Sequence, residues 1–287
     1  MIEINAHTKL CGVIGNPVEH SLSPAIHNAA FQKLGLNYVY LAFRVDDLAS
    51  AIGGVRALGT VRGLSVTIPH KIAIIPYLDE VETTAAHIGS VNTVVVENGR
   101  LLGYNTDASG ALRALTDAGV ALKGQRVVMV GSGGAARAIA FALAAGTGID
   151  RLAILGIEDA ERGRLADDLR AKTAVVVEDA PLNDSTLKEV IAGSHVLLHC
   201  TPIGMSPHID RTCIPAEFLH SSLTVMDIVY NPLETRLLRE ARAAGCRTIR
   251  GLDMFLNQAA AQFELWMQQP APADVMRTVL ESRWNHS

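Results

Sequence analysis

The sequence has few cysteines, and none of them stand in the Cys-x-x-Cys spacing of a metal or redox site. Scattered cysteines of this kind are typical of reduced, mostly buried thiols, so we expect a cytoplasmic protein without disulfides. The histidines show no His-Glu-x-x-His arrangement, and the sequence therefore predicts no metal centre. The four cysteines are Cys11, Cys200, Cys213 and Cys246.

Long hydrophobic runs and an excess of positive charge are also missing. The longest apolar runs, such as 138–145, fall far short of the roughly 20 residues that a membrane helix needs. The first residues, MIEINAHTKL, lack the charged and apolar regions of a signal peptide. With a net charge of −4 and no basic run, the chain is expected to bind neither nucleic acid nor a membrane surface.

What the sequence does contain is typical of a globular α/β protein. The 287 residues are 49% hydrophobic and 19% charged, which suits a substantial core divided between two domains. Short β-rich runs alternate with helical segments along the whole chain, and we see no internal repeat or low-complexity segment.

The first part of the chain predicts a mixed sheet. Asn98-Gly99 between two apolar runs is a strong signal for a two-residue hairpin, so the strands on either side should pair antiparallel. We expect strands at 10–15, 38–44, 63–68, 91–97 and 101–105, and helices at 24–34, 47–58, roughly 71–87 and 108–118.

The second part predicts a parallel, doubly wound sheet with helices between its strands. The helical end of the chain should pack back onto the first part and make that domain discontinuous. The expected domains are therefore 1–107 with 252–287, and 108–251. Strands are expected at 126–130, 152–157, 174–177, 196–200, 224–228 and 247–249.

A glycine loop, GSGGAA at 131–136, directly follows the strand 126–130 and opens a helix. It fits the pattern G-x-G-x-x-A in the context that gives this pattern meaning. Gly131 permits the tight turn, Gly133 lets the backbone approach a pyrophosphate, and Ala136 allows close packing of helix on strand. The helix N-terminus adds oriented N–H groups, so we expect a dinucleotide here.

The next strand end bears on which dinucleotide is bound. Glu158 and Asp159 stand where an acid would bind the ribose 2′-hydroxyl of NAD and repel the 2′-phosphate of NADP. The sequence thus favours NAD. Arg162 is near enough to leave NADP open, and the acids could instead belong to a solvated turn before the next helix.

In the first part, the stretch Ser-Leu-Ser-Pro predicts a helix start, with Ser23 as N-cap and Pro24 at the first helical position. A helix start with a second hydroxyl, Ser21, in front of it is also a small site for a carboxylate or phosphate. From these residues alone, a cap without a ligand remains an equal alternative.

Two further stretches carry chemistry. Strand alternation places Ser65 and Thr67 on one face, and Lys71 lies just beyond the strand's end. Asp107 either caps the following helix or forms a proton-transfer pair with Lys71. Beside a nicotinamide, such a pair would oxidise an alcohol without a metal.

Together these stretches resemble the shikimate dehydrogenase family, including its quinate/shikimate dehydrogenase relatives. The similar motifs occur in the family's order and span the chain almost from end to end. They are GNPVEHSLSPAIHN (15–28), VTIPHK (66–71), GSVNTVV (89–95), GYNTDASG (103–110), VGSGGAARA (130–138), TPIGM (201–205), VYNPLET (229–235) and GLDMFLNQAAAQFELW (251–266).

The resemblance implies an α/β substrate-binding catalytic domain plus a Rossmann NAD(P)-binding domain. It implies hydride transfer between the dinucleotide and 3-dehydroshikimate or shikimate, with a small-molecule substrate in the cleft between the domains. The implied catalytic residues are Lys71 and Asp107; the substrate-binding residues are Ser21, Ser23, Thr67, Asn92, Tyr230 and Gln258. The implied cofactor-binding residues are Gly131, Gly133, Gly134, Ala135, Glu158, Asp159, Thr201, Gly204, Met205, Gly251 and Met254.

The chain departs from the family's usual residues at three places. NADP-using members typically read Asn-Arg-Thr where this chain has Ile157-Glu158-Asp159, which again favours NAD. Ser65 and His199 both stand where asparagine is common. These departures leave quinate or an amino-substituted relative as alternative substrates.

Two other classes of protein share part of this pattern. A methylenetetrahydrofolate-type dehydrogenase shares the two-domain design, but the Ser-x-Ser and Asn-Thr-Asp stretches do not suit a folate. A non-catalytic shikimate-binding sensor could keep the substrate residues, although an intact Lys71 and Asp107 argue against it. We expect a monomer or a homodimer.

Overall fold

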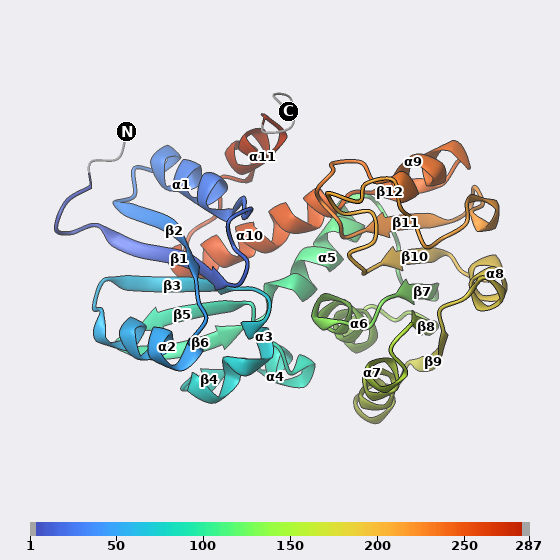
Figure 1. The fold of residues 1–287 in the computed structure, drawn as a ribbon, viewed down its shortest axis with the longest axis horizontal. Helices are drawn as coiled ribbons and strands as arrows, with labels where there is room; N and C mark the ends of the chain where they lie inside the picture. The colour runs from blue at the N-terminus through green and yellow to red at the C-terminus, as the bar shows by residue number, and fades with distance from the viewer. Residues whose placement is uncertain (1–3, 283–287) are drawn as a thin grey trace. The chain divides into compact units, whose positions relative to one another are not determined.

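The computed structural model of the chain describes residues 4–282, which form two compact units. Unit 1 comprises the residues up to Thr106 together with those from Leu256 onward, and unit 2 comprises Asp107–Phe255. Each unit has a six-stranded sheet with helices on both faces (Figure 1). The predicted α/β class with mostly parallel strands is confirmed.

The sheet of unit 1 has the strand order β2-β1-β3-β5-β6-β4. Strands β1, β2 and β3 are parallel, whereas β5 is antiparallel to both β3 and β6. Asn98 (φ 50°) and Gly99 (φ 77°) form the tight turn between β5 and β6, which confirms the predicted hairpin. The strands are β1 (Lys9–Gly15), β2 (Tyr38–Arg44), β3 (Val61–Val66), β4 (Glu80–Val81), β5 (Thr93–Glu97) and β6 (Arg100–Tyr104).

The single helix expected at roughly 71–87 is wrong, because the chain there forms four short elements. Proline has no N–H to donate and disfavours helix in the residue before it, so Pro76 prevents one continuous helix. The segment instead contains α3 (His70–Ala73), a 3₁₀ turn (Ile75–Tyr77), β4 and α4 (Thr83–Ile88). The other helices of this unit are α1 (Ser23–Lys33), α2 (Leu48–Ala57), α11 (Ala273–Ser282) and most of α10 (Gly251–Met267).

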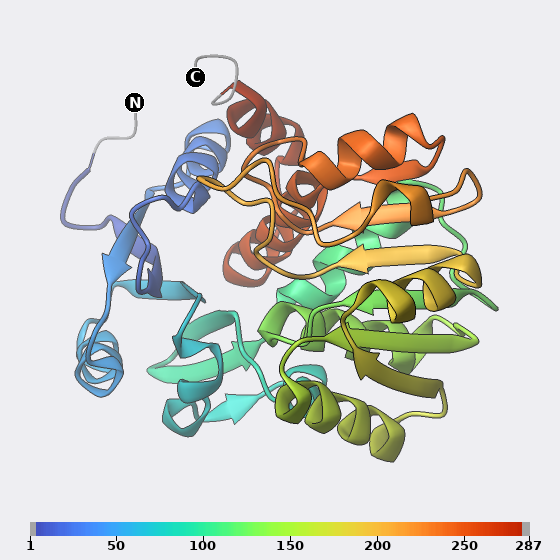
Figure 2. The same ribbon diagram turned by 45° about the vertical axis from the view of Figure 1, so that its right-hand side comes forward.

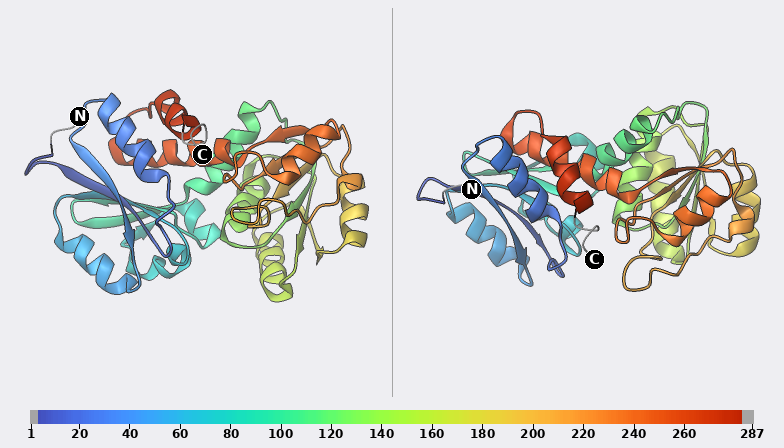
Figure 3. Two further views of the ribbon diagram at one scale, coloured as in Figure 1. Left: turned by 45° about the horizontal axis from the view of Figure 1, so that its top comes forward. Right: turned by 90° about the horizontal axis from the view of Figure 1, so that it is seen from above.

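Alternation along β3 separates the two faces of this sheet. Leu64 and Val66 belong to a buried apolar cluster with residues of α2 and α4, such as Ile52. Ser65, which lies between them, faces α10 and donates a hydrogen bond to Gln262 Oε1 of that helix (2.8 Å). Figure 1 shows α1 and α10 on one side of the sheet and α2 on the other, and both views in Figure 3 show α11 beside α1.

An aromatic cluster fills the α10 side of the core. The ring of His27 is fully buried and stacks on Tyr40 with their centroids 4.6 Å apart, and the Trp266 ring lies 5.2 Å away. Burial disfavours the charged form of the imidazole and lowers the pKa of His27 to about 3. His27 is thus a neutral residue whose ring packs within the aromatic core.

The sheet of unit 2 is parallel throughout, in the order β12-β11-β10-β7-β8-β9 (Figure 2). Its strands are β7 (Arg126–Val130), β8 (Arg151–Gly156), β9 (Val176–Pro181), β10 (Val196–His199), β11 (Thr224–Asp227) and β12 (Arg247–Ile249). The helices are α5 (Thr106–Asp117), α6 (Gly134–Gly146), α7 (Asp159–Lys172), α8 (Asp184–Ala192) and α9 (Arg236–Ala243).

The strand order of unit 2 reverses between β7 and β10. From β7 the chain proceeds outward through β8 and β9, and it then returns to the other side of β7 for β10, β11 and β12. In open parallel sheets, ligands bind beyond the carboxyl ends of the strands at such a reversal. Gly131 and Cys200, which directly follow β7 and β10, therefore flank the expected ligand position.

We predict that Gly63→Ala destabilises unit 1. A Cβ at Gly63 would collide with the indole of the buried Trp266, whose Nε1–H donates to the Val94 carbonyl (3.0 Å). Overpacking of this kind should lower the free energy of unfolding by about 1–3 kcal/mol, measured by urea denaturation.

Gly53→Ala is the matched control, since a Cβ there meets no atom within 4 Å and the residue lies within α2. This change should leave stability the same or raise it slightly, because alanine is the better helix former. A Gly63→Ala protein as stable as the wild type would contradict the described packing of Trp266.

Candidate active site

The two serines of the Ser-Leu-Ser-Pro stretch lie at the start of α1. The prediction that Ser23 caps this helix is wrong, because Ser23 is already helical and Leu22, which has no side-chain oxygen, takes the capping position. Ser21 Oγ instead accepts a hydrogen bond from the Ser23 N–H (3.3 Å). The Ser23 side chain is buried close enough to Tyr40 to affect the pKa of its hydroxyl. These hydroxyls thus surround a helix N-terminus that favours an anion.

Thr67 and Lys71 follow the end of β3. The Thr67 N–H donates to the Ile14 carbonyl (3.0 Å), which holds this segment against β1. Lys71 is the second residue of α3, and its carbonyl accepts a hydrogen bond from the Val91 N–H (2.8 Å). The backbone of Lys71 is therefore fixed next to the residue that precedes Asn92.

Asn92 is buried at the centre of a polar cluster. Its Oδ1 accepts hydrogen bonds from the Thr106 N–H (2.7 Å) and the Thr93 hydroxyl (2.8 Å). Its Nδ2 donates to the Thr106 hydroxyl (3.0 Å), which itself lies 3.5 Å from Gln258 Oε1. Two predicted substrate residues, Asn92 and Gln258, are thus brought together through Thr106.

A second row of buried polar groups continues this cluster behind β3. The Tyr40 hydroxyl donates to Ser65 Oγ (2.6 Å), and Ser65 donates to Gln262 Oε1 (2.8 Å). Gln262 Nε2 then donates to Thr93 Oγ1 (3.0 Å) and the Asn92 carbonyl (3.2 Å). Burial raises the pKa of Tyr40, so its hydroxyl keeps its proton.

The sequence reasoning missed Tyr40 and Gln262. Gln262 stands four residues after Gln258 on one helix, so the two share a face of α10, and this spacing could have been recognised. Tyr40 carried no such signal, because an aromatic residue in a strand is ordinarily part of an apolar core.

Two of the predicted catalytic and substrate residues, Asp107 and Tyr230, belong to unit 2. Asp107 is buried, at 7% exposure, and lies inside the first turn of α5, so it is not that helix's N-cap. Tyr230 stacks on Phe255 with ring centroids 4.8 Å apart, and burial raises its pKa.

The glycine loop of unit 2 has the geometry that the sequence predicts. Gly131 has φ +112°, and a Cβ there would lie 2.6 Å from the Cys200 carbonyl oxygen, so only glycine fits. Gly133 is the N-cap of α6 at φ −67°, a conformation open to any residue, and a Cβ there would meet no atom. The fold itself does not require glycine at this position, whereas close approach of a pyrophosphate would. Gly134 and Ala135 form the partly exposed first turn of α6.

The acids after β8 differ in what they contact. Asp159 Oδ1 accepts a hydrogen bond from Arg162 Nη1 (2.7 Å), and Asp179 Oδ2 accepts one from Arg162 Nε (3.1 Å). The Gly156 carbonyl takes a further bond from the same guanidinium (3.0 Å). Arg162 is thus buried and engaged by these acceptors, while Glu158 is exposed beside the strand end.

The loop after β10 contains the remaining predicted cofactor residues of this edge. Thr201 is partly buried and accepts a hydrogen bond from the Ile203 N–H (3.2 Å). Gly204 has φ +87°, and a Cβ there would lie 2.9 Å from the Arg211 carbonyl, so this turn requires glycine. Met205 is exposed at 47%.

Gly251 and Met254 lie in the first turn of α10. A Cβ at Gly251 would collide with the carbonyl oxygens of Ile228 and Val229, which lie just beyond β11. Met254 is buried at 7% exposure. The tight contact places the start of α10 against the carboxyl edge of the sheet of unit 2.

Residues 4–282 include no helix long and apolar enough to cross a membrane. Within the same range, no group of three or more His, Cys, Asp or Glu side chains is placed to hold a metal ion.

Two family models match this chain. The model of the shikimate dehydrogenase substrate binding domain matches residues 13–94, and that of the shikimate 5′-dehydrogenase C-terminal domain matches residues 251–281. The first matched range contains the serines of α1, Lys71 and Asn92, and the second contains Gln258.

Whole-chain relatives lead to the same family. A protein of Moorella thermoacetica named shikimate dehydrogenase (NADP(+)) is 48% identical over 98% of this chain and 95% of its own length. The structure of shikimate 5-dehydrogenase from Listeria monocytogenes in complex with shikimate and NAD has a TM-score of 0.92 at 39% identity, covering 98% of this chain and 99% of that one. Quinate dehydrogenase from Corynebacterium glutamicum in complex with NAD has a TM-score of 0.89 at 33% identity, covering 96% and 99%.

We predict that Gly133→Ala weakens dinucleotide binding without disturbing the fold. The added methyl meets no protein atom but occupies the space through which a pyrophosphate would approach the backbone. The affinity for NADH, followed by its fluorescence, should fall at least about tenfold, while the melting temperature stays within a few degrees.

Gly163→Ala in α7 serves as the control, because a Cβ there also meets no atom and the residue is within a helix that follows the loop's own helix in the chain. It should bind NADH as the wild type does. If Gly133→Ala bound NADH with undiminished affinity, the loop would not be the pyrophosphate site.

Proposed function

This chain belongs to the shikimate dehydrogenase family, and we propose from this that it catalyses the reversible NAD(P)-dependent oxidation of shikimate to 3-dehydroshikimate. The 48% identity to the Moorella thermoacetica enzyme, over nearly the whole of both chains, is the observation that carries the proposal. The buried polar cluster of unit 1 supports it, because such groups suit a hydroxylated ring acid.

We propose that Ser21 and Ser23 bind the substrate carboxylate at the N-terminus of α1. Two hydroxyls and the helix dipole favour an anion at this point. Thr67, Asn92, Tyr230 and Gln258 are proposed to bind ring hydroxyls. Asn92 and Gln258 can do so in fixed orientations, because Thr106 and Gln262 hold the surrounding groups in place.

The proposed catalytic residues are Lys71 and Asp107. A bound nicotinamide would supply the hydride acceptor for oxidation of the ring carbon and the hydride donor for the reverse reaction. Lys71 accepts the hydroxyl proton as the carbonyl forms and donates it back on reduction. The proposed cofactor residues are those named from the sequence, with the glycine loop of α6 holding the pyrophosphate.

Among the dinucleotides, we propose that NAD is preferred. Glu158 is free to accept hydrogen bonds from ribose hydroxyls and would repel a 2′-phosphate. Arg162, the basic group nearest in sequence, is already engaged by Asp159, Asp179 and the Gly156 carbonyl. This preference would differ from that in the name of the Moorella relative.

Quinate is a second candidate substrate. The hydroxyl of Ser65, where the family commonly has asparagine, is used by Tyr40 and Gln262. Serine is shorter than asparagine and its hydroxyl is already engaged, so the substrate ring would bind in a different position. The quinate dehydrogenase of Corynebacterium glutamicum is similar over 96% of this chain.

We also propose that residues 1–107 with 252–287 serve the substrate and residues 108–251 serve the dinucleotide. We propose a cytoplasmic location, as expected from the scattered, unpaired cysteines of the sequence. The monomer or homodimer expected from the sequence stays a prediction.

We predict that Lys71→Ala removes turnover but not dinucleotide binding. Loss of a positioned proton carrier should lower kcat with shikimate by about 10²–10⁴-fold, measured as NADH formation at 340 nm. NADH affinity should remain near that of the wild type. Lys33→Ala, which removes an exposed lysine at the end of α1, should have normal kcat. A normal kcat in Lys71→Ala would refute the assigned role.

The dinucleotide proposal predicts that the wild type has a higher kcat/KM with NAD than with NADP. Glu158→Arg should reverse the charge beside the ribose and raise kcat/KM with NADP at least about tenfold. Asp184→Arg makes the same charge change at an exposed position in α8 and should leave the ratio unaltered. A wild type that strongly prefers NADP would contradict the role given to Glu158 and Asp159.

A further inference from the structure

A buried histidine at the end of β10 has no part in the function proposed above. His199 is 2% exposed, and its two ring nitrogens have different partners. Nδ1 lies 2.9 Å from Asp227 Oδ1, and Nε2 lies 2.6 Å from Thr201 Oγ1. The ring thus connects β11 to the loop after β10.

The Asp227 carboxylate is held by donors on every side. Its Oδ1 accepts the Val229 N–H (3.0 Å), and its Oδ2 accepts the Thr235 hydroxyl (2.6 Å). Thr235 also caps α9 by accepting the Leu238 N–H (3.3 Å), so it cannot turn away cheaply. A fully buried carboxylate in this setting requires a proton on His199 Nδ1.

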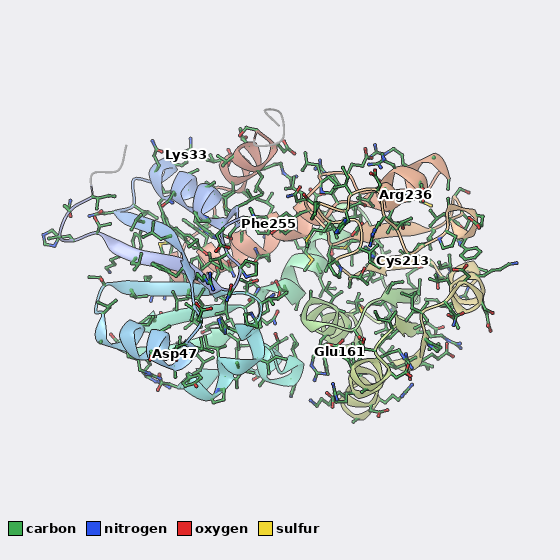
Figure 4. The ribbon with its side chains drawn as sticks, viewed as in Figure 1. Lys33, Asp47, Glu161, Cys213, Arg236 and Phe255 are labelled. Carbon is green, nitrogen blue, oxygen red and sulfur yellow. The ribbon has the colours of Figure 1, made fainter. Side chains whose placement is uncertain are left out.

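Two titratable groups act on the ring of His199: Asp227 from β11 and the Cys213 thiol from the loop after β10, labelled in Figure 4. Burial acts to lower the pKa of His199, but the hydrogen bond to Asp227, together with the nearby Cys213, outweighs it and raises the pKa to about 9. The next residue, Cys200, is buried with a raised pKa and stays neutral. At neutral pH, both ring nitrogens of His199 therefore carry protons.

The protonated ring determines what Thr201 can do. Its Oγ1 accepts the Ile203 N–H (3.2 Å), and with a proton on His199 Nε2 it also accepts from the ring. A hydroxyl oxygen has two acceptor positions and one proton to donate. With both acceptor positions filled, the hydroxyl proton of Thr201 has to point to a third group.

Thr201 lies where the strand order of unit 2 reverses. Its Cγ2 is 3.1 Å from the position of a Cβ on Gly131, the first residue of the glycine loop. His199 and Val130, the last residues of β10 and β7, are paired in the sheet. The side chain of Thr201 therefore lies beside the glycine loop proposed for the dinucleotide, with its methyl group toward Gly131.

We propose that His199 positions Thr201 as a hydrogen-bond donor to an oxygen acceptor of the dinucleotide, such as an amide carbonyl. The inference rests on the proposed dinucleotide binding and adds one positioning residue to it. When the ring loses its Nε2 proton, Thr201 donates to the ring instead. The ligand's oxygen then faces an acceptor, and its binding weakens.

The test is NADH binding to the full chain, followed by NADH fluorescence between pH 7 and pH 10 without substrate. In the wild type, Kd should rise about tenfold as the pH passes through 9, since one hydrogen bond is lost. His199→Asn should remove this step. Thr201→Val should bind weakly at every pH and show no step, whereas Thr201→Ser, which keeps the hydroxyl, should restore it.

Two controls separate His199 from other groups. His195→Asn changes a partly buried histidine of the same unit, which accepts the Arg126 N–H (3.0 Å), and should keep the step. Cys213→Ser should also keep a step, shifted to lower pH because one group that raises the His199 pKa is removed, which distinguishes the ring from the thiol. Nitrogen-15 NMR of the histidine rings should show both nitrogens of His199 protonated at pH 7 in the wild type and in Thr201→Val.

The outcomes separate this inference from the proposed function. NADH binding with no pH step, or a step that persists in His199→Asn or is lost in Cys213→Ser, would overturn the inference alone. A neutral His199 ring at pH 7 would do the same. A wild type that binds NADH at no pH would overturn both the inference and the dinucleotide-dependent function.

Discussion

The pairing of Asn92 with Thr106 is the interaction on which the buried polar cluster of unit 1 depends. Both groups are buried, and the amide of Asn92 satisfies the N–H and hydroxyl of Thr106 at the start of α5. A buried polar group without a partner costs about 1–3 kcal/mol, so this contact fixes both partners. Ser65, Gln262 and Thr93 extend it behind β3, and Gln258, which we propose as a substrate residue, contacts it through Thr106.

In unit 2, tight backbone contacts and paired charges hold the loops at the edge of the sheet in place. Its glycine loop and the loop after β10 are brought together by the reversal of strand order, and close backbone contacts at Gly131 require glycine. Buried charges there are paired, as with Arg162 and Asp179 or His199 and Asp227. Pairing of this kind decides which polar groups remain available to a ligand. Arg162 is engaged by Asp179, whereas Glu158 is exposed and can contact a ligand.

Local signals in the sequence predicted much of the fold. The buried β-branched run at 126–130, the Asn98-Gly99 turn and the glycine loop each occur as expected, because short-range sterics determine them. The expected helix over 71–87 failed where Pro76 and pairing of β4 with β6 compete with helix periodicity. The roles of Tyr40 and Asp227 could not be predicted, since their partners lie far away in sequence and meet only in the folded chain. For Gln262, its spacing from Gln258 on one helix was the only sequence signal.

We propose that the hydroxyls at the start of α1 and the amide cluster around Asn92 form the binding site of a ring acid. The most direct measurement is a crystal structure of the protein with shikimate and NADH bound. We predict the carboxylate within hydrogen-bond distance of Ser21 Oγ and Ser23 Oγ, with ring hydroxyls on Asn92 and Gln258. A ring bound elsewhere, or a carboxylate held by other groups, would contradict the account.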